Sequence, residues 1–175
     1  MQDELKAIQR LVGTTFIHVT HDQEEAMAIA DRIVVMNAGR IEDEGPPARV
    51  YRMPASLFAA DFMGEMNHIP ATVSATGAET PLGTLPAAGL VPGPATVCIR
   101  PEALCQPGGA LSLGEAEVRD ATFFGTHIRA HLSPKAAPEM VLVAHLSPGE
   151  VPSPGAVVSL TLSAEALSIF EGDSA

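Results

Sequence analysis

Lysine is almost absent from this 175-residue chain, which contains only Lys6 and Lys135. Ten basic residues stand against 21 acidic ones, and the formal net charge is −11. A protein that binds nucleic acid needs clustered cations to neutralise the phosphates, so this charge balance argues against nucleic acid as a partner. The same acidity argues against direct binding to anionic lipids.

Cysteines and long apolar runs are scarce as well. Cys98 and Cys105 lack the C-x-x-C spacing of a zinc site, so we expect buried structural thiols in a reducing compartment. No stretch reaches the 18 or so apolar residues of a membrane span, and the N-terminal sequence MQDELKAIQR is too charged for a signal peptide. We therefore expect a cytoplasmic location without direct insertion into a membrane.

Motifs for several kinds of catalysis are also missing. The sequence has no G-x-S-x-G element, no Cys/His nucleophile pair and no carboxylate dyad at a useful spacing. His18, His21 and Asp22 form an H-x-x-H-D pattern. On an extended strand, however, His18 and His21 point to opposite faces, so we do not expect these residues to share a metal ion.

The first apolar patterns predict a helix and a buried strand. Apolar residues at helical spacing predict a helix over residues 1–12, ended by Gly13. The run TTFIHV at 14–19 is β-branched and continuously apolar, which predicts a strand with other strands on both sides. No such partner strands occur within the first 65 residues. This segment therefore looks like a part of a larger α/β domain.

Capping and turn signals follow this strand. Thr20 with Gln23, or Asp22 with Glu25, can form a capping box at the start of a helix. The sequence RIVVMNAGRI then predicts a hairpin with its turn at 37–39.

The character of the sequence changes near residue 66. Before it, prolines separate two short helices; after it, Pro and Gly recur between short alternating runs such as ATVCIRP and AVVSLTL. These runs predict six or seven short strands in a small β-barrel or sandwich. His127, Arg129 and His131 alternate with apolar residues, so we expect them on the solvated face of a strand. We place two domains at 1–65 and 66–175.

Two long stretches of the chain resemble known domains. VTHDQEEAMAIADRIVVMNAGRIEDEGPPARVYRMPASLFAADFMGE closely resembles the C-terminal end of the nucleotide-binding domain of ABC transporter ATPases, and the resemblance covers Met1 to about Glu65. It implies the C-terminal part of a P-loop ABC ATPase domain, of the α/β class. Residues 67–175, with CIRPEAL and VSLTLSAEALSIF, resemble more loosely the TOBE-type accessory domain of import ABC ATPases, an all-β barrel related to the OB-fold.

His21 is the residue to which this resemblance assigns a role. In the ABC family, the histidine after the corresponding strand is the switch histidine of the H-loop, which contacts the γ-phosphate of ATP and helps hold the attacking water. The resemblance therefore implies that His21 is catalytic and contacts the cofactor, ATP with Mg²⁺. One oriented group of this kind contributes about 3 to 4 kcal/mol to transition-state stabilisation. From the residues alone, His21 is an ordinary turn or capping-region histidine.

The other parts of an ATP site are missing from the sequence. There is no GxxxxGK[ST] element to hold the phosphates, and the acidic pairs at 3–4 and 43–44 lack the apolar strand that precedes a Walker B carboxylate. LSLGEA at 111–116 lacks one glycine of the LSGGQ signature and lies after His21 instead of before it, so it predicts a turn and a strand. We expect that the chain alone neither binds ATP tightly nor hydrolyses it.

The resemblance also implies partners. A complete subunit of this kind pairs as a homodimer of ATP-binding subunits beneath two transmembrane permease subunits, peripheral on the inner face of the cell membrane. The TOBE domain adds dimer contacts or regulation. The transported substrate is a small solute such as a polyamine, iron(III) or a phosphonate, and the sequence does not choose among them.

Two other interpretations remain open. The chain could be a stand-alone small-ligand-binding or dimerisation module built on the barrel, without ATPase activity, because barrels of this type commonly bind ligands on one face. It could also be a regulatory fragment that joins an ATPase encoded by another gene.

Overall fold

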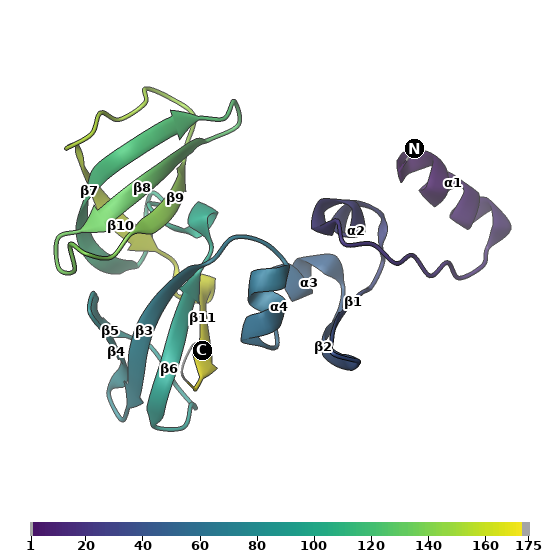
Figure 1. The fold of residues 1–175 in the computed structure, drawn as a ribbon, viewed down its shortest axis with the longest axis horizontal. Coiled ribbons are helices and arrows are strands. Elements are labelled where there is room, and N and C mark those ends of the chain that lie inside the picture. Colours follow the sequence, from purple (N-terminus) through teal and green to yellow (C-terminus); the bar gives the residue numbers. More distant parts are fainter. Residues whose placement is uncertain (1, 173–175) are drawn as a thin grey trace. The chain divides into compact units, whose positions relative to one another are not determined.

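The computed structural model describes residues 2–172, and the chain divides into two compact units, Met1–Gly64 and Glu65–Ala175. Helices α1 to α4 and one hairpin belong to the first unit, and strands β3 to β11 belong to the second (Figure 1). Among the described residues, none of the helices combines the length and the apolar character that crossing a bilayer requires.

The first unit begins with α1 (Gln2–Val12), which confirms the predicted helix except at Met1, a residue outside the described part. Its apolar residues are exposed, Leu11 to 87%. Residues 14–19, for which a strand is predicted, form no regular structure, and Ile17 and Val19 are 90% and 91% exposed. The strand prediction is wrong for this chain. The physical reason is that a central strand needs hydrogen-bonding partners on both edges, and no described strand pairs with this segment.

The predicted hairpin is present as β1 (Ile33–Asn37) and β2 (Arg40–Gly45), which pair in antiparallel register from Asn37↔Arg40 to Ile33↔Gly45. Ala38 and Gly39 connect the strands with φ of 46° and 78°. Two left-handed residues match the right-handed twist of a hairpin, and glycine adopts this conformation without steric cost.

Three helices complete the first unit: α2 (Gln23–Ile29), α3 (Pro47–Arg52) and α4 (Leu57–Phe62). The last two confirm the short helices predicted between prolines. The hairpin and the helices enclose a small core of Ile33, Val35, Val50, Ala59 and Met63.

Asp43 fastens α3 and the following loop to the hairpin. Its carboxylate, on β2, is 2% exposed and accepts two hydrogen bonds from the Arg49 guanidinium on α3. It also accepts the Ala55 backbone N–H at 2.8 Å. Burial alone raises the pKa of Asp43, but the hydrogen bonds and the charge of Arg49 outweigh burial and lower it below the ordinary value of 3.8.

The second unit consists of two antiparallel sheets. One has the order β11-β6-β3-β4-β5 and the other β10-β7-β8-β9. Figure 1 shows β3, β6 and β11 side by side in the first sheet and β7, β8 and β9 together in the second. The bounds are β3 (Asn67–Ser74), β4 (Gly77–Thr80), β5 (Gly83–Leu85), β6 (Gly93–Ile99), β7 (Leu111–Phe123), β8 (Ile128–Pro134), β9 (Leu142–Leu146), β10 (Val157–Leu162) and β11 (Leu167–Glu171).

Both sheets contribute to one apolar core, which includes Ile69 and Val97 of the first sheet and Leu132 and Leu160 of the second. The chain is therefore mostly β, as predicted for its larger part. The sequence LSLGEA opens the 13-residue strand β7, so the strand predicted there is present and the turn predicted with it is not. Short 3₁₀ turns at Pro101–Ala103 and Ala164–Ala166 follow β6 and precede β11.

Candidate functional site

His21 lies in the bend between the irregular segment 14–19 and helix α2. The residue is exposed, and within the described part of the chain no hydrogen bond to its imidazole is found. Its side chain is thus available to an external group, and its place is fixed by the backbone on either side.

The bend around His21 is held by a capping arrangement. The Asp22 side chain accepts the Glu25 backbone N–H at 3.0 Å, which confirms Asp22 with Glu25 as the predicted cap. The second half of the expected box differs. The Asp22 N–H donates to Thr20 Oγ1 at 3.0 Å, and the Thr20 hydroxyl donates to Glu25 Oε2 at 2.9 Å. Thr20 therefore lies between the cap residue and the glutamate.

His18 joins the same arrangement through its Nε2 atom, 3.3 Å from Glu25 Oε2. His18 and His21 do not alternate along a strand here, because the segment is irregular. Within the described residues, no three His, Cys, Asp or Glu side chains gather in a way that could hold a metal ion.

A second polar cluster lies on the sheet of β7 to β10. As predicted, β8 alternates buried and partly exposed residues, and Arg129 and His131 share its polar face. Arg129 pairs with the Glu65 carboxylate (Nη2–Oε1 2.5 Å), and its Nη1 lies 3.3 Å from His131 Nε2. A guanidinium can only donate, so in this hydrogen bond Arg129 is the donor and His131 Nε2 the acceptor.

Three aromatic rings, those of Phe124, His127 and His145, contact one another beside this pair. The rings of His127 and His145 lie 4.0 Å apart between centroids and are tilted by 35°, and the Phe124 ring stacks on His127 with its centroid 5.5 Å away. Burial, the neighbouring His127 and Arg129 lower the pKa of His145, against the opposing effect of nearby carboxylates. Sequence reasoning identified His127 but missed Glu65 and His145, because both approach β8 from other segments of the chain.

Cys98 and Cys105 form no disulfide in the described part of the chain. Cys98 is fully buried, as expected for a structural thiol, and its Sγ lies 3.7 Å from His68 Nδ1. Cys105 is partly buried, and burial raises the pKa of its thiol from 9.0 to about 11. A thiol with such a pKa is almost entirely protonated at neutral pH and is a poor nucleophile.

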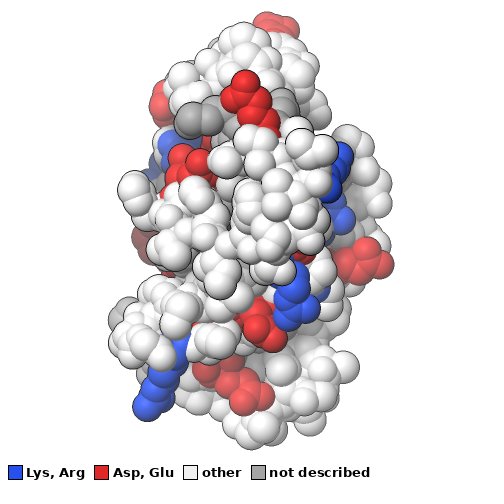
Figure 2. Space-filling view, turned by 90° about the vertical axis from the view of Figure 1, so that its right-hand side faces the viewer, with Lys and Arg blue, Asp and Glu red and all other residues white. Residues whose placement is uncertain are grey.

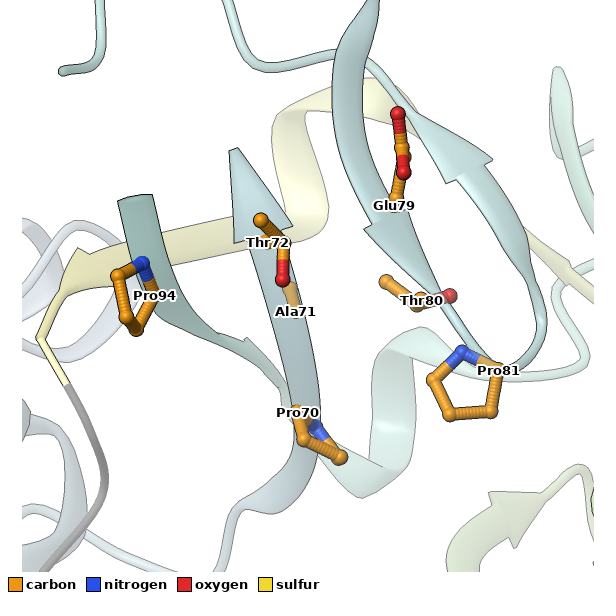
Figure 3. Close-up of a pocket in the computed structure, with 7 residues that line it drawn as sticks. All are labelled: Pro70, Ala71, Thr72, Glu79, Thr80, Pro81 and Pro94. Atoms are coloured by element: carbon orange, nitrogen blue, oxygen red, sulfur yellow. The ribbon is translucent and has the colours of Figure 1, made fainter. Parts of the chain in front are cut away.

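A shallow groove lies on the sheet containing β3 and β4 (Figure 3). Glu79 is the one ionisable residue among those that line it, and the Thr80 hydroxyl already donates to the Gly83 carbonyl. The groove therefore offers little chemistry. Its lining residues are Pro70, Ala71, Thr72, Glu79, Thr80, Pro81 and Pro94.

Figure 2 shows the charges on one face of the molecule. Among the described residues visible there, acidic and basic side chains are interspersed with uncharged ones, and the basic side chains form no continuous surface. This distribution agrees with the acidic composition of the chain.

Residues 97–170 match the TOBE domain family. This range runs from within β6 to within β11 and includes the whole four-stranded sheet. The resemblance to a TOBE domain is thereby confirmed for residues 97–170.

Curated proteins match the chain over its whole length. It is 41% identical over 190 aligned residues to the sulfate/thiosulfate import ATP-binding protein CysA 2 of Chromobacterium violaceum, covering 100% of this chain and 50% of that protein. It is 39% identical to the Fe(3+) ions import ATP-binding protein FbpC of Streptomyces avermitilis, covering 98% of this chain and 49% of that protein.

A third relative has a higher percentage identity over a shorter part of the chain. Over 73 residues, the chain is 58% identical to the spermidine/putrescine import ATP-binding protein PotA of Haemophilus ducreyi, covering 42% of this chain and 20% of that protein. The chain spans about half the length of the first two relatives. It is therefore a relative of the ATP-binding proteins of ABC importers, similar to the C-terminal portion of such a protein, and it carries a TOBE domain.

Proposed function

We propose that this chain supplies the H-loop segment and the TOBE domain of an ATP-binding subunit of an ABC importer, and that His21 acts as the switch histidine in ATP hydrolysis. The observation that carries the proposal is the match of the entire chain to import ATP-binding proteins. The place of His21 supports its role, because an exposed imidazole next to a well-fastened turn can reach a phosphate oxygen. On this proposal, residues 1–65 are the C-terminal segment of the α/β nucleotide-binding domain.

ATP with Mg²⁺ is the cofactor of the complete site under this proposal. In the chain's own sequence, His21 is the residue assigned to the γ-phosphate, whereas the phosphate loop and the Mg²⁺ ligands have no counterpart. The exposed run at 14–19 is consistent with this division. The side chains of Ile17 and Val19 are exposed here, as expected for a strand that is buried only in the sheet of a complete ATPase domain.

The partners follow from the same assignment. We infer a homodimer of ATP-binding subunits bound to transmembrane permease subunits on the cytoplasmic side of the membrane, with the TOBE domain adding dimer contacts or regulation. The relatives carry names for sulfate or thiosulfate, Fe(3+) and spermidine or putrescine import. We therefore propose a small solute as the transported substrate, without choosing among polyamine, iron(III), phosphonate or an inorganic anion.

The test uses the assembly purified from the source cells through a tag on this chain. We expect this assembly to hydrolyse ATP, and we expect His21→Ala to lower kcat about 100-fold or more, the loss typical of one oriented transition-state contact. Gln23→Ala is the matched control in the same turn and should leave kcat within about twofold of wild type. An assembly whose ATPase activity is indifferent to His21→Ala rules out the switch role.

The isolated chain gives a second measurement. Purified alone, it should show neither tight ATP binding in calorimetry nor turnover, because one histidine cannot replace the phosphate loop and metal ligands. Turnover that survives purification and disappears in His21→Ala would contradict this expectation. A dimer that binds a small ligand and ignores ATP would instead favour the stand-alone module as the function.

A further inference from the structure

We propose that Glu25 is the positioning residue of His21, and that it acts through Thr20. The inference rests on the proposed function, because it explains how the turn that carries the switch histidine is held in shape. It concerns a residue that touches neither ATP nor water in the reaction.

Three hydrogen bonds form a closed loop around His21. The Thr20 hydroxyl donates to Glu25 Oε2 at 2.9 Å, the Asp22 N–H donates to Thr20 Oγ1 at 3.0 Å, and the Glu25 N–H donates to Asp22 Oδ1 at 3.0 Å. Both chain neighbours of His21 are therefore fixed to the first turn of α2. Because His21 itself lacks a hydrogen-bond partner among the described residues, this loop is what restricts the direction of its Cα–Cβ bond.

The Glu25 carboxylate determines the orientation of the Thr20 hydroxyl. An ionised carboxylate can only accept, so the hydroxyl proton must point to Glu25. The oxygen lone pairs of Thr20 then remain free to accept the Asp22 N–H. Without the carboxylate, the hydroxyl can rotate and donate to water or to a backbone carbonyl, and the Asp22 N–H loses a well-oriented acceptor.

The surroundings of Glu25 favour this role over that of an ordinary surface acid. Its side chain is 24% exposed. Its Oε2 atom lies 3.3 Å from His18 Nε2 and also accepts the Thr20 hydrogen bond, so two residues contact the carboxylate. Partial burial reduces the screening of both contacts by solvent. Glu24, the neighbouring acid in the same helical turn, is exposed, and its side chain forms no hydrogen bond or ion pair with the described residues. The two acids provide a matched pair for an experiment.

The kinetic experiment uses the tagged assembly from the source cells. We expect Glu25→Ala to lower kcat on the order of 10- to 100-fold, because a misplaced catalytic group loses rate steeply with distance, while the KM for ATP stays within about twofold. Glu25→Gln should recover most of the rate, since an amide oxygen can still accept from Thr20. Glu24→Ala should match wild type. Thr20→Val should lower kcat as much as Glu25→Ala, and the double variant no further.

A spectroscopic measurement on the 175-residue chain tests the geometry without the reaction. We expect amide exchange at Asp22 to accelerate at least about tenfold in Glu25→Ala and Thr20→Val, and to stay unchanged in Glu24→Ala. The remaining protected amides of the first unit, read in the same spectra, report whether each variant is folded. Exchange at Asp22 that is unaffected by Glu25→Ala would overturn the inference.

The outcomes separate the inference from the proposed function. A large loss of kcat in His21→Ala with wild-type kcat in Glu25→Ala overturns the positioning role alone. Wild-type kcat in His21→Ala overturns the proposed function and the inference with it. A loss of kcat in both variants supports both proposals, provided that Glu25→Gln recovers most of the rate and Glu24→Ala keeps wild-type kcat.

Discussion

The side-chain amide of Asn67 pairs in both directions with the backbone of Val143. Asn67 Oδ1 accepts the Val143 N–H at 2.6 Å, and Asn67 Nδ2 donates to the Val143 carbonyl at 2.8 Å. The same Nδ2 also donates to the Ile99 carbonyl at 3.1 Å. Since Asn67 begins β3, the central strand of one sheet, and Val143 lies on β9, an edge strand of the other, one buried side chain links the two sheets of the second unit.

Asn67→Ala should therefore destabilise the second unit. The variant removes three hydrogen bonds and leaves partly buried backbone groups without their partners, which costs about 3 kcal/mol of unfolding free energy. Urea unfolding followed by circular dichroism measures the change. Asn37→Ala, at an exposed asparagine of the hairpin, is the control and should cost less than about 0.5 kcal/mol. Equal midpoints for the two variants would contradict the linking role of Asn67.

Local signals in the sequence predicted local structure. The Asp22 cap, the hairpin turn at Ala38 and Gly39, and the helices between prolines all depend on residues within five positions of one another, and all are present. The polar face of β8 also followed from simple alternation. These features form because short-range hydrogen bonds and backbone preferences decide them.

Long-range relations were not predictable in the same way. The strand expected at 14–19 requires neighbours that the chain does not provide, so its apolar residues stay exposed. The pairing of Glu65 with Arg129 spans 64 positions and that of Asn67 with Val143 spans 76. No periodicity reveals such contacts, because they depend on how the sheets pack. For Glu25 the sequence predicted only one of two contacts. The hydrogen bond of its backbone N–H to the Asp22 cap was expected, whereas that of its carboxylate with Thr20 was not.

The Asp43–Arg49 pair gives a prediction for the first unit. Asp43→Ala removes the carboxylate acceptor of the Ala55 N–H and of the Arg49 guanidinium, which retains only the Glu44 and Met53 carbonyls, and should cost about 3 kcal/mol. Arg49→Lys should cost about half as much, because a lysine cannot donate two parallel hydrogen bonds. The measurement is thermal unfolding of each variant. Glu44→Gln, at an exposed ion pair with Arg32, serves as the control and should change stability only slightly.

Acid should also release this pair. The pKa of Asp43 is lowered in the folded protein, so the unfolded state binds more protons and stability falls as pH decreases below the ordinary value of 3.8 toward the folded value. In wild type, the unfolding midpoint of the first unit should drop across this range. Asp43→Asn should show a shallower drop, and an identical slope in both proteins would show that Asp43 does not titrate with unfolding.

Cys105 should react slowly with alkylating reagents. Its pKa of about 11, against an ordinary 9.0, lowers the thiolate fraction at pH 8 about 100-fold. Iodoacetamide labelling followed by mass spectrometry should therefore show slow modification of Cys105 in the native chain and rapid modification in urea. Fully buried Cys98 should be protected as well. Native labelling of Cys105 at the rate measured in urea would contradict the raised pKa.

His145 should make the second unit sensitive to mild acid. Burial, His127 and Arg129 lower its pKa from 6.5, while Glu102 and Glu65 act in the opposite direction. In the unfolded chain this histidine takes up a proton at higher pH than in the folded protein. Its contribution to stability is therefore complete above about pH 6.5 and is lost as pH falls through that value toward the lowered folded pKa.

The variant His145→Gln should flatten this dependence. Between pH 7.5 and about 5.5, the urea midpoint of the second unit should fall less in the variant than in wild type, because glutamine cannot take up a proton. His18→Gln, in the first unit, is the control and should retain the wild-type slope. His127→Gln should reduce the slope in part, since it removes one of the charges that disfavour protonation of His145 but leaves the buried ring. If His145→Gln and His127→Gln both keep the wild-type slope, the contact between these two histidines does not control the acid response.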